Sequence, residues 1–219
     1  ASSPWLDLEQ WKAGQSAWTP DLVEGRPCFG GLDLSSKTDL AAFVLMFPPM
    51  PEDDRWRVLA WFFTPADGLE KRARQARAPY QRWVEQHHLM TNPGNRIDHL
   101  VIRDTIFAAH ARFPVQLLGY DPWNIGNLAS DLQGVLGDDR VVEIPQTIAQ
   151  MSEPSKEWEA EVGAARIDAA GHPIVTWNIS NVVVITDSKE NIFPTKKKSR
   201  GRIDGVVAGI MGLKLARLG

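Results

Sequence analysis

The chain contains 219 residues, of which 43% are hydrophobic and 23% are charged, and its formal net charge is −3. This length allows a complete hydrophobic core, and we expect no membrane partner because no apolar run approaches the roughly 20 residues of a membrane span. The single cysteine, Cys28, excludes an intrachain disulfide and a cysteine-based zinc site, and the net charge gives no global indication of a polyanionic partner.

The first 27 residues combine three tryptophans with polar residues and Pro20. We expect a short helix and an extended lead-in whose aromatic side chains dock on the rest of the protein. Residues 1–27 are therefore interpreted as a lead-in or interdomain segment, and residues 28–219 as the main domain.

Three apolar segments then follow in the pattern of antiparallel strands. Residues 28–32, 40–47 and 55–63 predict strands joined by two hairpin connections, the first of which turns through residues 35–39.

Helical and extended segments alternate in the next hundred residues, where buried positions repeat every three or four residues within each expected helix. In chain order we expect a helix over 67–86 that breaks at Pro79, a helix capped by Asp98 and ended by Pro114, a strand at 115–120, a helix that buries Ile125, Leu128, Leu132 and Val135, a strand at 141–144, and a helix at 153–165.

The C-terminal part predicts a hairpin and a final helix. The hairpin is expected to pair 174–185 with 191–193 through a turn at 187–190, and the helix to run from 203 to 217. This order predicts an α/β fold with a ribonuclease H-like mixed sheet. Three antiparallel strands are followed by parallel βα units, helices cover both faces, and a β-hairpin precedes the C-terminal helix.

Three carboxylates fall at informative places in this plan. Asp33 stands on the first strand where an apolar residue would be expected, and a buried charge is costly there unless it is paired or holds a cation. Asp121 follows the strand at 115–120, at the edge where open α/β sheets place ligands, and Asp204 opens the last helix. Taken singly, Asp33 and Asp121 also suit turns, and Asp204 suits a helix N-terminus.

If the first strand and the strand at 115–120 are neighbours, the three carboxylates can meet in one cleft. Carboxylates without nearby cysteine or histidine favour hard cations, Mg²⁺ or Mn²⁺. Two such ions about 4 Å apart activate a water and stabilise the leaving oxygen of a phosphoryl displacement. We therefore expect Asp33, Asp121 and Asp204 to be catalytic metal ligands for two ions.

Two further features need interpretation. Arg166-Ile167-Asp168 repeats the tripeptide that ends at Asp204, but a loop composition follows it, so Asp168 is interpreted as a loop residue. The run at 196–202 contains five lysines and arginines, which suit either phosphate contacts beside the acids or a solvated loop.

Several segments together resemble the nuclease domain of the large subunit of tailed-bacteriophage terminases. They occur in that family's order and span most of the chain from about residue 28. They are Gly-Gly-Leu-Asp-Leu-Ser-Ser-Lys-Thr-Asp at 30–39, Thr-Asn-Pro-Gly-Asn at 91–95, Tyr-Asp-Pro-Trp-Asn at 120–124, Pro-Ser-Lys-Glu-Trp-Glu at 154–159, Trp-Asn-Ile-Ser-Asn at 177–181, and Pro-Thr-Lys-Lys-Lys-Ser at 194–199 leading to Arg-Ile-Asp-Gly at 202–205.

The resemblance implies a ribonuclease H-like nuclease domain at 28–219 that cuts double-stranded DNA with divalent metal during genome packaging. It assigns the metal ligands to the same three aspartates and adds Asp39 as a weaker candidate. It also favours three residues of the basic run as DNA contacts, namely Lys196, Lys198 and Arg202.

The implied partners are double-stranded DNA, the terminase ATPase domain, the small subunit and the portal, in the cytoplasm of the infected bacterial host. The chain has no phosphate-binding loop of the form Gly-x-x-x-x-Gly-Lys-Ser/Thr. We therefore expect that it neither hydrolyses ATP nor translocates DNA by itself.

Two alternatives stay open at this point. The segment at 30–38 also resembles the first phosphate loop of sugar kinases and actin-like proteins, and the first alternative is therefore a phosphotransferase fragment. Such proteins need a second glycine-rich loop after an aspartate, and Asp121 is followed by Pro-Trp-Asn instead. The other alternative is a DNA-docking module with an inactive site.

Overall fold

The structure is a computed structural model that describes residues 4–218, so positions 1–3 of the expected lead-in segment and position 219 of the expected main domain lie outside the described residues. In chain order the elements are α1 (Leu8–Ala13), the 3-10 helix η1 (Pro20–Val23), β1 (Cys28–Asp33), β2 (Ala41–Phe47), β3 (Trp56–Pro65), α2 (Leu69–Ala76), α3 (Tyr80–Glu85), β4 (Leu89–Asn92), α4 (His99–Arg112), β5 (Val115–Tyr120), α5 (Leu128–Leu136), the 3-10 helix η2 (Asp138–Arg140), β6 (Val141–Glu143), α6 (Ile148–Gly163), β7 (Ile167–Asp168), α7 (Pro173–Asn181), β8 (Val184–Thr186), β9 (Ile192–Pro194) and α8 (Asp204–Leu218).

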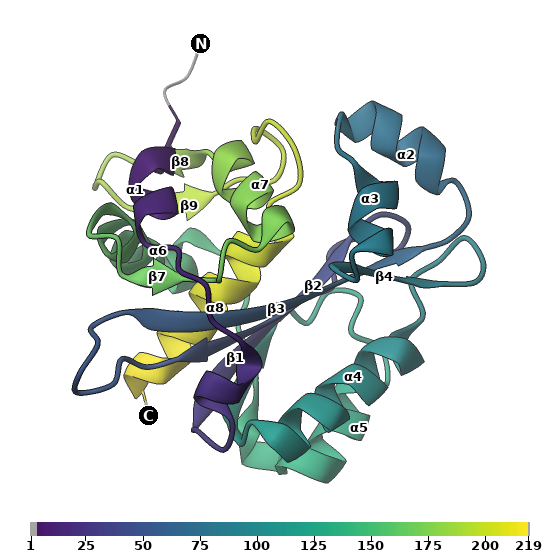
Figure 1. Cartoon of the computed structure of the whole chain (residues 1–219), viewed down its shortest axis with the longest axis horizontal. Coiled ribbons are helices and arrows are strands. Elements are labelled where there is room, and N and C mark those ends of the chain that lie inside the picture. The colour runs from purple at the N-terminus through teal and green to yellow at the C-terminus, as the bar shows by residue number, and fades with distance from the viewer. Residues whose placement is uncertain (1–3, 219) are drawn as a thin grey trace.

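A mixed sheet with the strand order β4-β3-β2-β1-β5-β6 forms the middle of the molecule (Figure 1). β1, β2 and β3 are antiparallel neighbours, as expected, and β5 and β6 continue the sheet in parallel beyond β1. On the other side, β4 and the short β7 pair in parallel with β3. The predicted mixed α/β sheet is therefore confirmed.

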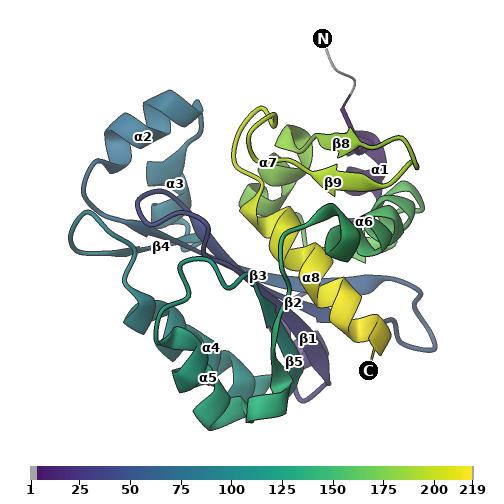
Figure 2. The same ribbon diagram turned by 180° about the vertical axis from the view of Figure 1, so that it is seen from behind.

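Helices cover both faces of the sheet, because the side chains of its central strands alternate between two apolar cores. On β2, Phe43 and Leu45 belong to the core that includes α4 and α5, whereas Val44 and Met46 belong to the core that includes α6, α7 and α8. Figure 2 shows α8 crossing the sheet, with α4 and α5 packed on the opposite face.

α8 and β1 approach each other closely, backbone against backbone. A Cβ placed on Gly31 would lie 1.8 Å from the carbonyl oxygen of Ala208, and one on Gly212 would lie 2.9 Å from the carbonyl oxygen of Phe29. The absence of side chains at these glycines lets the two backbones touch. This contact fixes the start of α8 above the end of β1.

The expected strand at 174–185 is wrong in its first part. Pro173–Asn181 forms α7, whose first turn is capped by His172: its Nδ1 accepts hydrogen bonds from the backbone N–H groups of Ile174 and Val175 at 3.2 and 3.5 Å. The β-branched composition favoured a strand, but the helix buries Ile174 and Asn178 on one side against the sheet-side core, and tertiary packing overrides the local preference. Only β8 and β9 form the predicted hairpin.

Other differences concern element boundaries and one missed strand. β4 was not predicted, α6 begins at Ile148 rather than at 153, and Val135 is exposed while Leu136 is buried in its place. Asp168, expected in a loop, lies in β7 with no exposed surface. The two-residue β7 is too short to leave a periodic signal, and its place is set by pairing with β3.

The tryptophans of the lead-in dock on the main body, as expected. The indole N–H groups of Trp5, Trp11 and Trp18 donate to the side chains of Glu159, Thr176 and Asp168 at 2.7, 3.0 and 3.0 Å.

Candidate metal centre

The sheet register brings two of the three predicted aspartates to the same edge. β1 and β5 are parallel neighbours, and Leu32 pairs with Tyr120, so Asp33 and Asp121 each stand one residue beyond this pair. Asp33 is 1% exposed, whereas Asp121 is half-buried in the turn after β5. The expectation that these two strands are neighbours is confirmed.

The third aspartate reaches this edge through α8. Asp204 is the first residue of α8 and is 1% exposed. The side-chain oxygen of Asn178, on α7, accepts a hydrogen bond from the backbone N–H of Gly205 at 2.9 Å and so caps the start of the helix. Sequence analysis missed this role of Asn178 because it assigned the segment to a strand.

A lysine ammonium lies between two of these carboxylates. Lys196 Nζ donates to Asp33 Oδ1 and Oδ2 at 2.8 and 2.7 Å, contacts Ser35 Oγ, and lies 3.9 Å from Asp204 Oδ1. Ser35 Oγ in turn lies 3.5 Å from Asp204 Oδ1. Asp33 and Asp204 therefore share one cation, although they lie 171 positions apart in the sequence.

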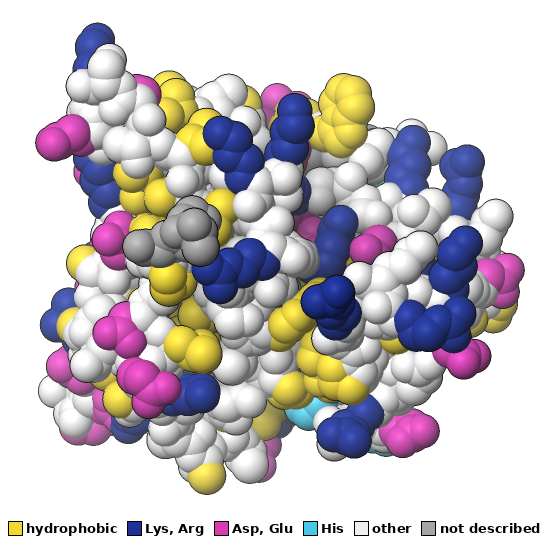
Figure 3. All heavy atoms as spheres, turned by 90° about the horizontal axis from the view of Figure 1, so that it is seen from above, with side chains coloured by type: hydrophobic (Ala, Val, Ile, Leu, Met, Phe, Trp, Pro, Cys, Tyr) yellow, Lys and Arg dark blue, Asp and Glu magenta, His cyan; other side chains and the backbone are white. Residues whose placement is uncertain are grey.

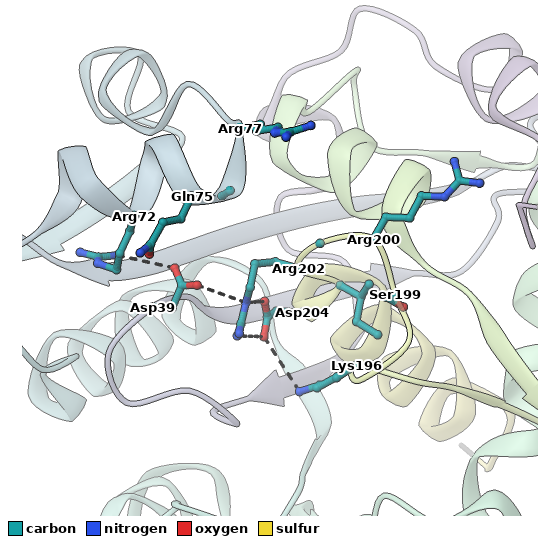
Figure 4. A pocket seen from close by; sticks show the side chains of 12 residues that line it. Asp39, Arg72, Gln75, Arg77, Lys196, Ser199, Arg200, Arg202 and Asp204 are labelled. Carbon is teal, nitrogen blue, oxygen red and sulfur yellow. Dashed lines mark hydrogen bonds and ion pairs between the residues drawn. The ribbon is translucent and has the colours of Figure 1, made fainter. Parts of the chain in front are cut away.

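Arg202 supplies the second positive charge at Asp204. Its Nε and Nη2 donate to the two carboxylate oxygens at 2.9 and 2.8 Å, a bidentate pair that fixes the orientation of both side chains (Figure 4). The two predicted DNA contacts Lys196 and Arg202 thus point inward at the acids, whereas Lys198 is exposed on the same loop.

The three carboxylates also interact electrostatically. Burial opposes ionisation of Asp33, but the charge and hydrogen bonds of Lys196 outweigh it and lower the pKa of Asp33. At Asp204, burial raises the pKa, Arg202 opposes the shift, and the charge of Asp33 adds to it. Burial and the charge of Asp33 likewise raise the pKa of Asp121, against a hydrogen bond from the backbone N–H of Trp123. Asp33 therefore acts on both of the other carboxylates.

The oxygen atoms of these three aspartates and of Ser35 are chemically suited to bind a hard cation. They are carboxylate and hydroxyl oxygens, two of the carboxylates are almost fully buried, and the ammonium of Lys196 stands where a cation neutralises them. Among residues 4–218 no three acidic, histidine or cysteine side chains are already arranged around one metal position. Asp121 instead accepts the hydrogen bond of its own turn from Trp123.

Asp39 lies on the far side of Arg202 from Asp204. It accepts a hydrogen bond from the hydroxyl of Tyr80 at 3.2 Å and lies 3.6 Å from Arg72 and 3.8 Å from Arg202. Its neighbours here are cations and a phenol, and its role as a metal ligand stays a prediction.

A cavity of about 550 Å³ opens beside Asp204 (Figure 4). One wall is the loop 196–203, and the other contains Arg72, Gln75 and Arg77 from α2 and its C-terminal end. These α2 residues were not among the site residues predicted from the sequence. The charge pattern of one helix does not reveal which segment packs opposite it.

Comparison with known proteins agrees with this fold. The family described as "Terminase large subunit, endonuclease domain" matches residues 1–219. The chain is 32% identical over 191 residues to the terminase large subunit of Enterobacteria phage HK97, covering 87% of this chain and 38% of that protein. It is 31% identical to the protein YmfN of Escherichia coli K12, covering 100% of this chain and 50% of that protein.

Solved structures give the same result. The crystal structure of the HK97 large terminase superposes with a TM-score of 0.87 at 30% identity, covering 97% of this chain and 43% of that one. The nuclease domain of the large terminase of bacteriophage SPP1, solved with bound Mn, superposes with a TM-score of 0.52 at 10% identity, covering 91% and 92% of the two chains. The SPP1 match shows a shared fold.

The mixed sheet and its helices define a fold of the ribonuclease H-like class. The chain belongs to the endonuclease-domain family of terminase large subunits. It spans between 38% and 50% of the length of the two curated relatives. No helix within residues 4–218 is both long and apolar enough to cross a membrane.

Proposed function

We propose that this chain is a metal-dependent endonuclease domain that cuts double-stranded DNA during viral genome packaging. The observation that carries the proposal is the sharing of Lys196 by two carboxylates that are each 1% exposed. Two buried acids that share one ammonium are well placed to bind a divalent cation in its stead.

In this proposal Asp33, Asp121 and Asp204 hold two ions, Mg²⁺ or Mn²⁺. When bound, the ions would supply activation of a water and stabilisation of the leaving oxygen, so that one P–O ester bond is exchanged for a bond to the oxygen of water. Metal dependence is supported by relatives solved with bound Mn and bound magnesium.

The protein's own groups have separate tasks. Arg202 keeps Asp204 in one orientation through its bidentate pair, and Ser35 links the loop after β1 to both carboxylates. If Asp33 held an ion, the ammonium of Lys196 would no longer be needed there and would be available to a DNA phosphate, together with that of Lys198. Asp39 is proposed, at lower priority, as an outer acidic contact.

The wider assembly is also part of the proposal. Residues 1–27 would lead from a terminase ATPase domain to the nuclease domain at 28–219. The complete protein would act with the small subunit and the portal in the cytoplasm of the infected bacterial host. Membership of the terminase family argues against the phosphotransferase alternative. Metal-dependent DNA cleavage by the chain would exclude the alternative of an inactive docking module.

The test is cleavage of plasmid DNA. We expect nicking or cutting with Mg²⁺ or Mn²⁺ and loss of activity in EDTA. Asp33→Asn should reduce the rate about 10³-fold or more, which corresponds to about 4 kcal/mol of lost transition-state stabilisation, because it removes a proposed metal ligand. Undiminished cutting by Asp33→Asn and Asp204→Asn would refute the assignment. A complete absence of metal-dependent cutting by the wild type would favour the docking module.

A further inference from the structure

The cavity beside Asp204 is a groove with a cationic rim on each side. Five cationic side chains and only two carboxylates line it; the cations are Arg72, Arg77, Lys196, Arg200 and Arg202, and the carboxylates are Asp39 and Asp204. Figure 3 looks down onto this end of the molecule and shows lysine and arginine side chains gathered over the half where α2 lies in Figure 1. A groove of this charge favours a polyanion.

The floor of the groove is a fixed row of alternating charges. Arg72 donates to the carbonyl oxygens of Pro65 and Asp67 at 2.6 and 3.1 Å and pairs with Asp39 at 3.6 Å, while Arg202 lies between Asp39 and Asp204. Arg72 is therefore held by the protein, and its side chain is only 15% exposed. The row connects the α2 rim to the proposed metal ligand Asp204.

Arg77 and Gln75 differ from this row. Both are exposed and line the groove, and within residues 4–218 neither side chain makes a hydrogen bond or ion pair with the protein. Arg77 ends α2 in the left-handed conformation, with φ at 53°, a position that glycine usually takes. Figure 4 shows its guanidinium extended over the groove, opposite the loop that carries Lys196 and Ser199.

We propose that this groove binds the sugar-phosphate backbone of DNA next to the phosphate that is cut, and that Arg77 and Gln75 are phosphate contacts supplied by α2. This inference rests on the proposed nuclease function and extends its DNA footprint to a second element. A guanidinium and an amide N–H offer donors to phosphate oxygens, and the floor already neutralises its own carboxylates. The contact positions the duplex without reading its sequence.

The decisive variant is Arg77→Ala, with Arg74→Ala as its matched control. Arg74 lies on the same helix, has a 68% exposed side chain paired with Glu70, and does not line the groove. Binding of a fluorescent duplex of about 25 base pairs is measured by anisotropy in Ca²⁺ or EDTA, so that cleavage does not interfere. Salt is varied, because each phosphate contact adds about one unit to the slope of log K against log salt.

We expect Arg77→Ala to weaken DNA binding about three- to tenfold and to reduce the salt slope by about one, equally for unrelated duplex sequences. Gln75→Ala is expected to have a smaller effect of the same kind, and Arg74→Ala to change binding less than twofold. In cleavage assays with Mn²⁺, Arg77→Ala should raise KM and leave kcat and the metal titration unchanged.

Equal DNA affinity of Arg77→Ala and wild type would overturn the proposal that the groove binds DNA. Equal losses of affinity in Arg77→Ala and Arg74→Ala would also overturn it, because they would indicate diffuse charge attraction. These binding results do not depend on cleavage. If the wild type binds DNA through Arg77 but never cuts it, the nuclease function is refuted and the DNA-binding groove remains supported. If it cuts DNA normally but Arg77→Ala binds equally well, the groove is refuted and the nuclease function remains supported.

Discussion

The same tripeptide, Arg-Ile-Asp, ends in two buried aspartates with opposite environments. Asp168 accepts hydrogen bonds from the backbone N–H groups of Ser16 and Ala170, from Ser16 Oγ and from Trp18 Nε1, and pairs with Arg55 at 3.2 Å. Asp204 is paired with Arg202 and shares Lys196 with another buried acid beside an open groove. A closed set of protein donors stabilises the fold, whereas a carboxylate that lines an open groove is available to a ligand.

The arginine of the tripeptide behaves differently as well. Arg202 pairs with the aspartate two residues later, whereas Arg166 turns away and pairs with Glu161 at 2.7 Å. Asp168 is instead neutralised by Arg55, which directly precedes β3, and by Arg57 within β3. It is tied to the lead-in segment by Ser16 and Trp18. Its interactions therefore fasten the first residues to the sheet, and those of Asp204 prepare a site.

The largest effect that tests this comparison is on catalysis. Asp204→Asn should reduce DNA cleavage about 10³-fold or more. It should not lower Tm, because burial and Asp33 raise the pKa of Asp204, and a raised carboxyl pKa costs stability as pH rises through it. Plasmid cleavage measures the rate, and circular-dichroism melting measures Tm. A fall in Tm with preserved cleavage would reverse the roles assigned to the two aspartates.

Asp168→Asn should act on stability. Breaking a buried charge set costs about 3–5 kcal/mol, which lowers Tm on the order of 10 °C in a chain of this size. Cleavage by the folded protein at low temperature should stay within about twofold of wild type. Asp138→Asn, at an exposed aspartate, is the matched control. If Asp168→Asn melts like that control, the closed set of donors does not support the fold.

The stability of the protein should also depend on pH through His172, the residue that caps α7. Burial and His88 lower the pKa of the α7 cap His172 to about 3. The unfolded chain therefore binds this proton more readily, and stability is lost as pH falls from about 6.5 towards 3. Between pH 6.5 and 5 the loss is about 2 kcal/mol.

Urea unfolding at the two pH values measures this loss. His172→Asn keeps a capping acceptor but does not titrate, so most of the difference should disappear in that variant. The exposed His87→Asn should retain it. Identical pH dependence in both variants would mean that His172 is protonated without cost in the folded protein.

The smallest expected effect concerns the exchangeable cation. Lys196→Ala should bind Mn²⁺ about tenfold more tightly, a change of about 1.4 kcal/mol, because no ammonium competes for Asp33 and Asp204. Calorimetric titration measures it, with the exposed Lys198→Ala as control. Weaker Mn²⁺ binding in Lys196→Ala would show that the lysine supports the metal site and does not compete for it.

Much of the site could be predicted because a charge in an apolar strand is conspicuous. Asp33 stands out among buried neighbours, and the βα order places Asp121 one strand away. The tripeptide alone could not show that Asp168 and Asp204 have different roles. The loop composition after Asp168 was misleading, because the residues that pair with it, Arg55 and Trp18, lie about 110 and 150 positions earlier in the chain. Likewise, α7 was mistaken for a strand because β-branched residues suit either element until their burial is known.

The sequence by itself determined the residue types and the order of elements: an apolar β1 that ends in Asp33, an aspartate after β5, and another at the start of α8. Only the tertiary structure decided which cation stands between the acids, which aspartate is closed off, and that α2 forms the second wall of the groove. The reason is physical, because the free energy of a buried charge is set by the groups that surround it in space, and these come from distant parts of the chain.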